Sequence, residues 1–359
     1  MHKLAVLTGG GDCPGLNAVI RAIVKSGYQE GIEVIGIRDG FRGAVEEEYR
    51  LLNLSDVSGI LPRGGTLLGT TNRDNPFAYS TLVDGQIQPV DRSDDVISQL
   101  QGIGVEALLA IGGDGSLSIA LEFAKKGLPV IGIPKTIDND LMATDVTFGF
   151  QTAVSTAQDA LDRLHTTAES HHRVMILEVM GRYAGWIALY AGVAGGADVI
   201  LIPEIPYELS RVAAAVKKRA DLGKKFSIIV VAEGAAPLGG EMVVERKMPG
   251  RIDPIKLGGI GAKLGEDLET LTGMETRVTV LGHLQRGGSP NAADRVLATR
   301  YGVAAVEAAL DGDFGTMVAL QGQKIVRVPL AEAVNKLKKV SPDEPVLNAA
   351  RKLGIMMGD

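Results

Sequence analysis

Several features that define other protein classes are scarce in this chain of 359 residues. Its one cysteine, Cys13, cannot form an intrachain disulfide, which is typical of a protein in a reducing cytoplasm. No apolar stretch reaches the length of about 18 residues that crosses a membrane. The first residues contain only a short apolar run, too short for a signal-peptide core. We therefore expect a cytoplasmic protein with no membrane partner.

A basic surplus is also missing. The chain has 37 Lys and Arg against 43 Asp and Glu, a net charge of −6, which argues against a general nucleic-acid binder. Short repeats and Pro/Ser-rich linkers are missing too, so composition does not locate a domain boundary. A length near 360 with 45% hydrophobic residues predicts an ordinary globular protein with two domains.

Glycine, by contrast, is abundant. It makes up 46 of 359 residues, where a share of roughly 7% is usual. Because these glycines follow no period and come without a proline excess, collagen-like and linker-like chains are excluded. The surplus indicates backbone positions that need positive φ or close approach to a ligand.

Short β-branched runs alternate with helical stretches along the chain. Continuous apolar runs of this kind indicate parallel strands covered on both faces, so we predict a doubly wound α/β fold. We predict a helix at 17–26, closed by Gly27, and one from the GGDGS stretch that ends at Lys125-Lys126-Gly127. Residues 84–95 are predicted as a polar surface loop, and a strand pair at 316–320 and 324–328 precedes a short helix near 332–338; none of these segments is given chemistry. The main strands are predicted at 4–7, 34–37, 107–111, 130–133, 174–179, 199–202, 227–232 and 278–281.

Two predicted strands lead through glycines into a helix. Gly9, Gly10 and Gly11 follow the first, and Gly112 and Gly113 precede Asp114 after another. Backbone amides at a helix start bind anions, and a carboxylate there can hold Mg²⁺ beside a phosphate chain. A tight turn without a ligand, or an aspartate that only caps its helix, remains the alternative.

Three further polar clusters follow predicted strands. Asp138 lies in the acidic IDND stretch, where a carboxylate can act as general base in phosphoryl transfer or belong to an ordinary turn. Arg182 lies between a strand and a helix, where it could clamp a phosphoryl group or merely line a rim. His283 and Arg286 lie in a glycine-flanked loop suited to a phosphate dianion. Together, the five motifs favour phosphoryl transfer between two phosphorylated ligands.

This set of motifs resembles the 6-phosphofructokinase family. GGGDCPGLNAVIR, RGGTLLGT, IGGDGS, PKTIDND, VMGRYAGW and GHLQRGG occur in the family's order over residues 4 to about 300. The resemblance implies two Rossmann-like domains with mainly parallel sheets. It implies a nucleotide-binding domain of residues 1–149 plus about 290–338, and a sugar-phosphate-binding domain of residues 150–289 plus about 339–359.

The resemblance implies transfer of a phosphoryl group from ATP to the 1-hydroxyl of fructose 6-phosphate. Asp138 would be the general base, Arg182 would stabilise the moving γ-phosphoryl, Thr136 would contact both ligands, and Asp140 would support the metal site. Asp114 would bind Mg²⁺. The implied ATP-binding set is Gly11, Arg73, Gly113, Asp114, Gly115 and Ser116. The implied substrate-binding set is Thr136, Asp138, Arg173, Met180, Gly181, Arg182, Glu233, Arg277, His283 and Arg286.

Two pairs of residues carry finer implications. Arg173 and Arg277 match arginines that family members insert from a neighbouring subunit, which implies a homo-oligomer with shared active sites, a tetramer or else a dimer. Plain surface pairing is the alternative for both. Gly115 and Lys135 match positions that set the phosphoryl donor: a carboxylate at 115 would repel a nucleotide's α-phosphate, whereas glycine leaves room, so ATP is favoured.

The resemblance also bears on regulation, and three rival functions stay open. Four positions match a bacterial effector site between subunits, but Leu222 stands where an arginine is expected, so we hypothesise altered or absent control by ADP or phosphoenolpyruvate. A pyrophosphate-dependent phosphofructokinase is the nearest rival function. Another GGDG kinase, such as an NAD kinase, and a non-catalytic subunit that senses sugar phosphates are the others. The candidate effector residues are Arg21, Arg63, Asp198 and Lys224.

Overall fold

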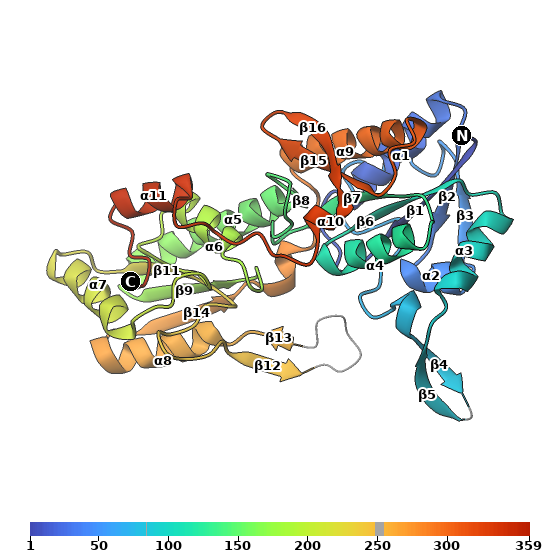
Figure 1. Ribbon diagram of the computed structural model, residues 1–359. Coiled ribbons are helices and arrows are strands. Elements are labelled where there is room, and N and C mark those ends of the chain that lie inside the picture. The colour runs from blue at the N-terminus through green and yellow to red at the C-terminus, as the bar shows by residue number, and fades with distance from the viewer. Residues whose placement is uncertain (84, 248–254) are drawn as a thin grey trace.

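The chain forms two lobes that lie side by side (Figure 1). The computed structural model describes residues 1–83, 85–247 and 255–359. The first lobe is built on an 8-stranded sheet of order β16-β15-β7-β6-β1-β2-β3, with β8 paired to β7. The second lobe is built on a 4-stranded sheet of order β10-β11-β9-β14. In the described residues, no helix is long and apolar enough to span a bilayer.

The first sheet is parallel at its centre and buried on both faces. Leu4 and Val6 of β1 pack in one apolar cluster, and Ala5 and Leu7 in the other, because side chains alternate along a strand. Helices α1 and α9 cover the first face, and α2, α3, α4 and α10 the second. The strands are β1 (Lys3–Thr8), β2 (Glu33–Ile37), β3 (Tyr49–Leu52), β6 (Ala107–Gly112), β7 (Val130–Thr136), β8 (Phe148–Gly149), β15 (Thr316–Gln321) and β16 (Lys324–Pro329). The helices are α1 (Leu16–Gln29), α2 (Phe41–Val45), α3 (Ser93–Gly102), α4 (Asp114–Lys125), α9 (Ala292–Leu310) and α10 (Leu330–Ala333).

The second sheet is parallel throughout and covered in the same way. Its strands are β9 (Val174–Val179), β10 (Val199–Leu201), β11 (Ser227–Ala232) and β14 (Thr276–Val280). Helices α5 (Phe150–His171) and α6 (Trp186–Ala194) pack on one face, and α7 (Leu209–Asp221) and α8 (Ile260–Thr272) on the other. Both sheets confirm the doubly wound α/β class. The domain boundaries at 149, 290 and 338 stay a prediction.

Three local predictions are wrong. Residues 86–95 are not a loop. Strands β4 (Tyr79–Val83) and β5 (Gln86–Val90) form an exposed hairpin, whose backbone hydrogen bonds need no apolar side chains, and α3 begins at Ser93. Asp84 lies outside the described residues. Helix α1 does not end at Gly27 but continues to Gln29, and Gly27 instead gives Val34 room to pack. No helix covers 334–338, because Asn335 turns left-handed at φ 65°.

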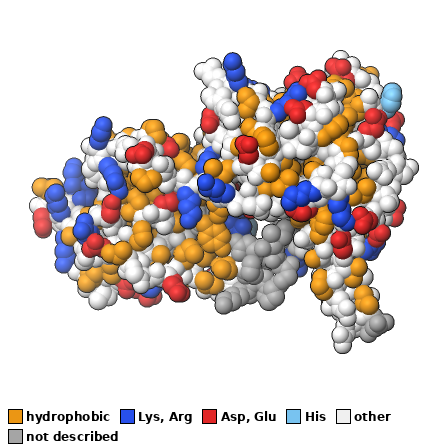
Figure 2. Space-filling view, viewed as in Figure 1, with side chains coloured by type: hydrophobic (Ala, Val, Ile, Leu, Met, Phe, Trp, Pro, Cys, Tyr) orange, Lys and Arg blue, Asp and Glu red, His pale blue; other side chains and the backbone are white. Residues whose placement is uncertain are grey.

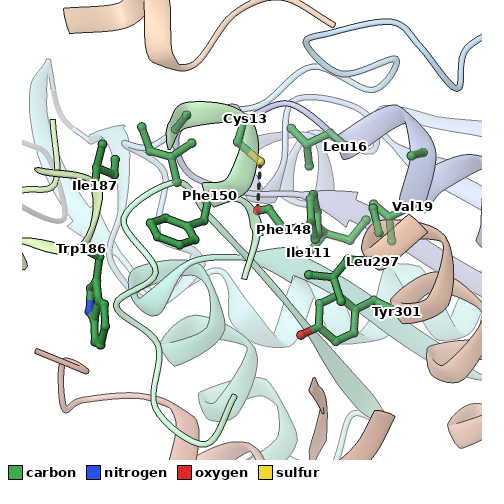
Figure 3. Packing of buried hydrophobic residues seen from close by; sticks show 14 of the residues in the cluster. Cys13, Leu16, Val19, Ile111, Phe148, Phe150, Trp186, Ile187, Leu297 and Tyr301 are labelled. Atoms are coloured by element: carbon green, nitrogen blue, oxygen red, sulfur yellow. Dashed lines mark hydrogen bonds between the residues drawn. The ribbon is translucent and has the colours of Figure 1, made fainter. Parts of the chain in front are cut away.

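A continuous apolar core joins the lobes where β8 leads into α5. Figure 3 shows Cys13, Phe148, Phe150 and Trp186 in this core. The Cys13 thiol donates to the Phe148 carbonyl at 3.6 Å, and a Cβ at Gly149 would lie 2.6 Å from its Sγ. Gly149 also has φ 100°, so both the close approach of the sulfur and the left-handed backbone require glycine there. This packing anchors the glycine loop that precedes α1. The hairpin of β12 (Val244–Lys247) and β13 (Ile255–Leu257) lies outside it.

Candidate active site

Asp138 lies just beyond the carboxyl end of β7, where ligands of open α/β sheets bind. Its side chain is 5% exposed, and its backbone N–H donates to Thr136 Oγ1 at 3.0 Å. Asp138 Oδ1 is buried and, among the described residues, accepts no hydrogen bond. A buried carboxylate oxygen without a donor is costly, so this atom is suited to accept one from a ligand.

The turn that holds Asp138 is fixed from behind. Asn139 is left-handed at φ 51°, and its Oδ1 accepts the Thr147 N–H at 3.0 Å. Thr147 Oγ1 donates to the Thr136 carbonyl at 2.7 Å. These contacts cross-link the two ends of the loop that contains the predicted catalytic residues. A left-handed asparagine held this tightly is typical of a functional turn.

Two more carboxyl groups face Asp138. Burial, and then the charge of Asp138, raise the pKa of Asp140 to about 7. The same two causes raise the pKa of Glu233, at the end of β11, to about 7. Arg182 opposes both shifts, and Asp114 adds to that of Asp140, so the structure brings these five charged groups within electrostatic reach. Such a cluster favours cations or a phosphate-bound metal ion.

Arg182 lies in the turn between β9 and α6. It is left-handed at φ 52°, its N–H donates to Glu233 Oε1 at 3.1 Å, and its carbonyl leaves no room for a side chain at residue 234. The preceding Met180 N–H donates to Gln285 Oε1 at 2.8 Å, and Gly181 has φ 146°. Gln285, which no sequence motif marked as functional, is fully buried, and its Nε2 has no partner among the described residues.

The glycine-rich turns lie against one another on the first sheet. Ser116 is buried between them, because a Cβ at Gly9 would lie 2.6 Å from its Oγ and one at Gly112 2.4 Å from its Cβ. Its side chain thus packs the turns together. Asp114 is the first residue of α4, with Gly113 at the N-cap, and its Oδ1 accepts the Asn335 N–H at 2.9 Å.

Two cations reach the first glycine loop. The buried Lys135 ammonium on β7 donates to the Gly11 carbonyl, and burial lowers its pKa. Arg286 Nη1 donates to the Asp12 carbonyl at 3.0 Å, and a Cβ at Gly11 would lie 2.5 Å from that nitrogen. The structure therefore places Arg286, expected at the sugar phosphate, against the donor loop. His283 is exposed in the same short 3-10 helix region, Gly282–Gln285.

Arg73 is exposed in a segment tied to this loop. Gly10 N–H donates to the Thr71 carbonyl at 2.9 Å, and Thr70 Oγ1 donates to the Gly10 carbonyl at 2.6 Å. Arg73 follows immediately and donates its own N–H to Thr71 Oγ1 at 3.2 Å. The segment therefore brings Arg73 near the predicted phosphate cradle. Figure 2 shows basic side chains on both lobes beside the boundary between them.

Arg173 and Arg277 lie at the wrong edge to serve the site of their own chain. Both pair with Glu275, at 2.5 Å from Arg173 Nε to Oε2, near the amino ends of β9 and β14. Met180 follows the opposite end of β9, and a strand of 6 residues spans roughly 20 Å. In a single chain, surface pairing therefore occupies both arginines.

The candidate effector residues fall into two pairs in different lobes of the chain. Arg21 lies on α1 and Arg63 in the first lobe, whereas Asp198 and Lys224 flank strands of the second. Asp198 accepts Arg219 Nη1 at 2.8 Å on one oxygen and the Ile228 N–H at 2.8 Å on the other. Both of its carboxylate oxygens are therefore already used inside the chain.

The comparisons with known proteins agree with this geometry. The family model for phosphofructokinase matches residues 3–309. An ATP-dependent 6-phosphofructokinase of Chloroflexus aggregans is 57% identical over 360 residues, 100% of this chain and 98% of that protein. A pyrophosphate–fructose 6-phosphate 1-phosphotransferase of Amycolatopsis methanolica is 53% identical over 343 residues, 95% of this chain and 97% of that protein. The structure of phosphofructokinase from Saccharomyces cerevisiae matches with a TM-score of 0.78 and 33% identity, over 92% of this chain and 45% of that longer one. The chain therefore belongs to the phosphofructokinase family.

Proposed function

We propose that this enzyme transfers the γ-phosphoryl group of ATP to the 1-hydroxyl of fructose 6-phosphate, a kinase reaction of glycolysis. The observation that carries the proposal is the buried Asp138 carboxylate, whose Oδ1 accepts no hydrogen bond from the described residues. Asp138 takes the hydroxyl proton as the sugar oxygen attacks phosphorus. The bond from phosphorus to the bridging oxygen breaks, and ADP leaves with that electron pair.

The other roles follow from position. Arg182, fixed by its N–H to Glu233, stabilises charge on the moving phosphoryl group. Thr136 orients Asp138 through its Oγ1. Gly11, Gly113, Gly115, Ser116 and Arg73 surround the donor phosphates, and Met180, Gly181, Glu233 and His283 hold the sugar phosphate. Arg286 serves the sugar phosphate from its position beside the donor loop.

The residues present are suited to Mg²⁺. Mg²⁺ usually binds through one or two carboxylates plus substrate phosphates rather than an all-protein cage. In the described part of the chain, no group of three or more His, Cys, Asp or Glu could hold a metal alone, whereas the charge of Asp114 contributes to the raised pKa of Asp140. We propose Asp114 as the ligand with support from Asp140. The ion would neutralise phosphate charge.

Overall identity does not decide the donor, since relatives named for each donor exceed 50% identity. We propose that Gly115 discriminates between ATP and pyrophosphate, because a carboxylate there would repel a nucleotide's α-phosphate whereas glycine leaves room. We expect turnover with ATP and none with pyrophosphate. Gly115→Asp should lower kcat/KM for ATP by about 100-fold, because a like charge 4 Å from phosphate costs up to about 4 kcal/mol at an effective dielectric of 20. A donor panel with fructose 6-phosphate at fixed Mg²⁺ measures both.

The matched control for this test is Gly115→Asn, which adds the same volume without the charge. It should retain far more ATP activity than Gly115→Asp. Turnover of the unaltered enzyme with pyrophosphate but not ATP would overturn the donor assignment in favour of the pyrophosphate-dependent alternative.

Shared active sites are part of the proposal. We propose a homo-oligomer, a tetramer or else a dimer, in which Arg173 and Arg277 leave Glu275 and serve a neighbour's sugar site. Arg173→Ala and Asp138→Asn should each be nearly inactive alone. Unfolding and refolding the two variants together should restore activity, because some sites then receive both intact residues.

The same co-refolding experiment tests the alternative, simple surface pairing. Near-normal activity of Arg173→Ala alone would favour surface pairing, and no gain of activity in mixed Arg173→Ala and Asp138→Asn preparations that form hybrid oligomers would overturn the shared site. Refolding Arg173→Ala with Arg277→Ala is the control, because a site that takes both arginines from one neighbour is never repaired.

The cellular location of the enzyme and its control by effectors are also part of the proposal. We propose a cytoplasmic location, because the single cysteine is buried and forms no disulfide. We propose altered or absent control by ADP and phosphoenolpyruvate, since the exposed Leu222 stands where an arginine would contact the effector phosphate. A non-catalytic subunit remains disfavoured, because it would not need Asp114, Asp138 and Arg182 together.

A further inference from the structure

A segment without helix or strand connects α10 to α11 (Pro345–Lys352). We call residues 334–344 the strap. In Figure 1 it is the red trace that passes from the first lobe to the second. No sequence motif points to chemistry in the strap. Its Leu337 forms an isolated bridge with Leu141, directly beyond the acidic turn.

Lys338 is the centre of the strap's contacts. Its ammonium donates to Asn139 Oδ1 at 3.2 Å and to the carbonyls of Thr144 and Asp145, each at 2.9 Å. An ammonium has three hydrogens, so every donor is used. The same nitrogen lies 5.4 Å from the centroid of the Trp186 ring, a cation–π distance.

The strap's backbone holds the same place. Lys338 N–H donates to the Asp140 carbonyl at 2.8 Å, and Trp186 Nε1 donates to the Lys338 carbonyl at 2.7 Å. Burial lowers the pKa of Lys338 to about 8, so the ammonium is still charged at neutral pH. A partly buried lysine with all three ammonium hydrogens bound is costly to misplace.

What Lys338 holds is the back of the catalytic turn. Asn139 separates Asp138 from Asp140, and its Oδ1 accepts both the Thr147 N–H and Lys338. Asn139 and Lys338 also line a cavity of about 290 Å³. The turn therefore has free volume into which it can shift once the lysine is removed.

The strap touches the other catalytic turns as well. Asn335 donates its N–H to Asp114 Oδ1 at 2.9 Å, from a left-handed conformation. Val340 donates its N–H to Glu204 Oε1 at 2.9 Å. Glu204 in turn accepts the Gly185 N–H at 3.1 Å, just beyond the turn of Arg182. One segment thus links the donor, base and arginine turns.

We propose that Lys338 is a positioning residue for phosphoryl transfer, which holds the Asp138 turn in its reactive geometry from behind. The proposal rests on the proposed function. Lys338 touches neither reacting atom; it acts through Asn139 and the two loop carbonyls. A displacement of about 1 Å at a reacting group can cost about 100-fold in rate, so a loss of this size is expected when the turn loosens.

The test compares Lys338→Met with Lys336→Met, an exposed lysine of the same strap. Lys338→Met should lower kcat by about 30- to 100-fold and leave KM for fructose 6-phosphate and ATP within about threefold. Lys336→Met should match the unaltered enzyme. Lys338→Arg, which keeps the charge and several donors, should recover part of the lost kcat.

Hydrogen exchange provides a second readout that needs no turnover. In Lys338→Met the Thr147 amide, bonded to Asn139, should exchange at least about tenfold faster, while amides in the centre of β6 and β9 do not change. If the methionine variant does not fold, Lys338→Gln, which keeps amide donors, takes its place in both measurements.

The outcomes separate the two proposals. If the unaltered full-length enzyme turns over neither donor, the proposed function fails, and exchange at Thr147 alone decides whether Lys338 holds the turn. An unchanged kcat in folded Lys338→Met, a loss shared equally with Lys336→Met, or unchanged exchange at Thr147 would each overturn the role of Lys338.

Discussion

Asp138→Asn should lower kcat by about 10²- to 10⁴-fold, the range that a positioned general base supplies. Asparagine keeps the shape of the side chain but cannot take the hydroxyl proton. In the variant, the atom at the position of the buried Asp138 Oδ1, which accepts no hydrogen bond within the described residues, can no longer take a proton from the substrate. Steady-state turnover and calorimetric binding of fructose 6-phosphate measure the effect, and binding should change by less than about threefold.

A control on the same loop is available. Asp145 accepts the Gly322 N–H at 2.6 Å with its carboxylate and has no proposed chemical role. Asp145→Asn should retain kcat within about threefold, apart from any effect on stability. Asp138→Asn with near-normal turnover would remove Asp138 as the base, and loss of sugar binding in parallel would make it a binding residue instead.

Arg182→Gln should lower kcat by about 10³-fold, since an arginine on a transferring phosphoryl group typically contributes 10³ to 10⁵. The turn is left-handed at φ 52°, a strain that glutamine shares with arginine. The substitution therefore removes the guanidinium without releasing the backbone. Rapid-quench measurement of the phosphoryl-transfer step tests this directly.

Arg182→Lys separates charge from geometry. Lysine keeps a cation but loses the planar, bidentate fork, so its rate should lie between those of arginine and glutamine. If Arg182→Gln stays within tenfold of the unaltered enzyme, the phosphoryl group is stabilised elsewhere. Arg286, already at the donor loop through Asp12, would then be the next residue to replace.

The sheets could be predicted because their strands are continuous apolar runs. Residues 174–179 and 227–232 read as buried strands, and the structure gives β9 and β11 the same bounds. The ends of the helices were harder to predict. Gly27 is a common helix terminator, but here it remains in α1 because its missing side chain gives Val34 space. Tertiary packing overrode the local signal.

Parts of the site could also be predicted, since motifs follow strand ends. Arg182 and Glu233 gather because β9 and β11 run parallel and end at one edge of the second sheet, and Asp138, which follows β7 of the first sheet, lies within electrostatic reach of both. Lys338 and Gln285 could not be predicted. Lys338 donates to a backbone carbonyl nearly 200 positions away and Gln285 accepts a backbone N–H, and such contacts leave no pattern in the sequence. A glutamine inside GHLQRGG was the only available signal.

Cys13 has a practical consequence. Burial raises the pKa of its thiol, so almost no thiolate exists in the native protein, and the Phe148 carbonyl and Gly149 close off the sulfur. An alkylating reagent can therefore modify the chain only after the junction between the lobes has opened. The rate at which Cys13 is alkylated in the native protein therefore measures the rate of that opening, and no cysteine has to be introduced for the measurement.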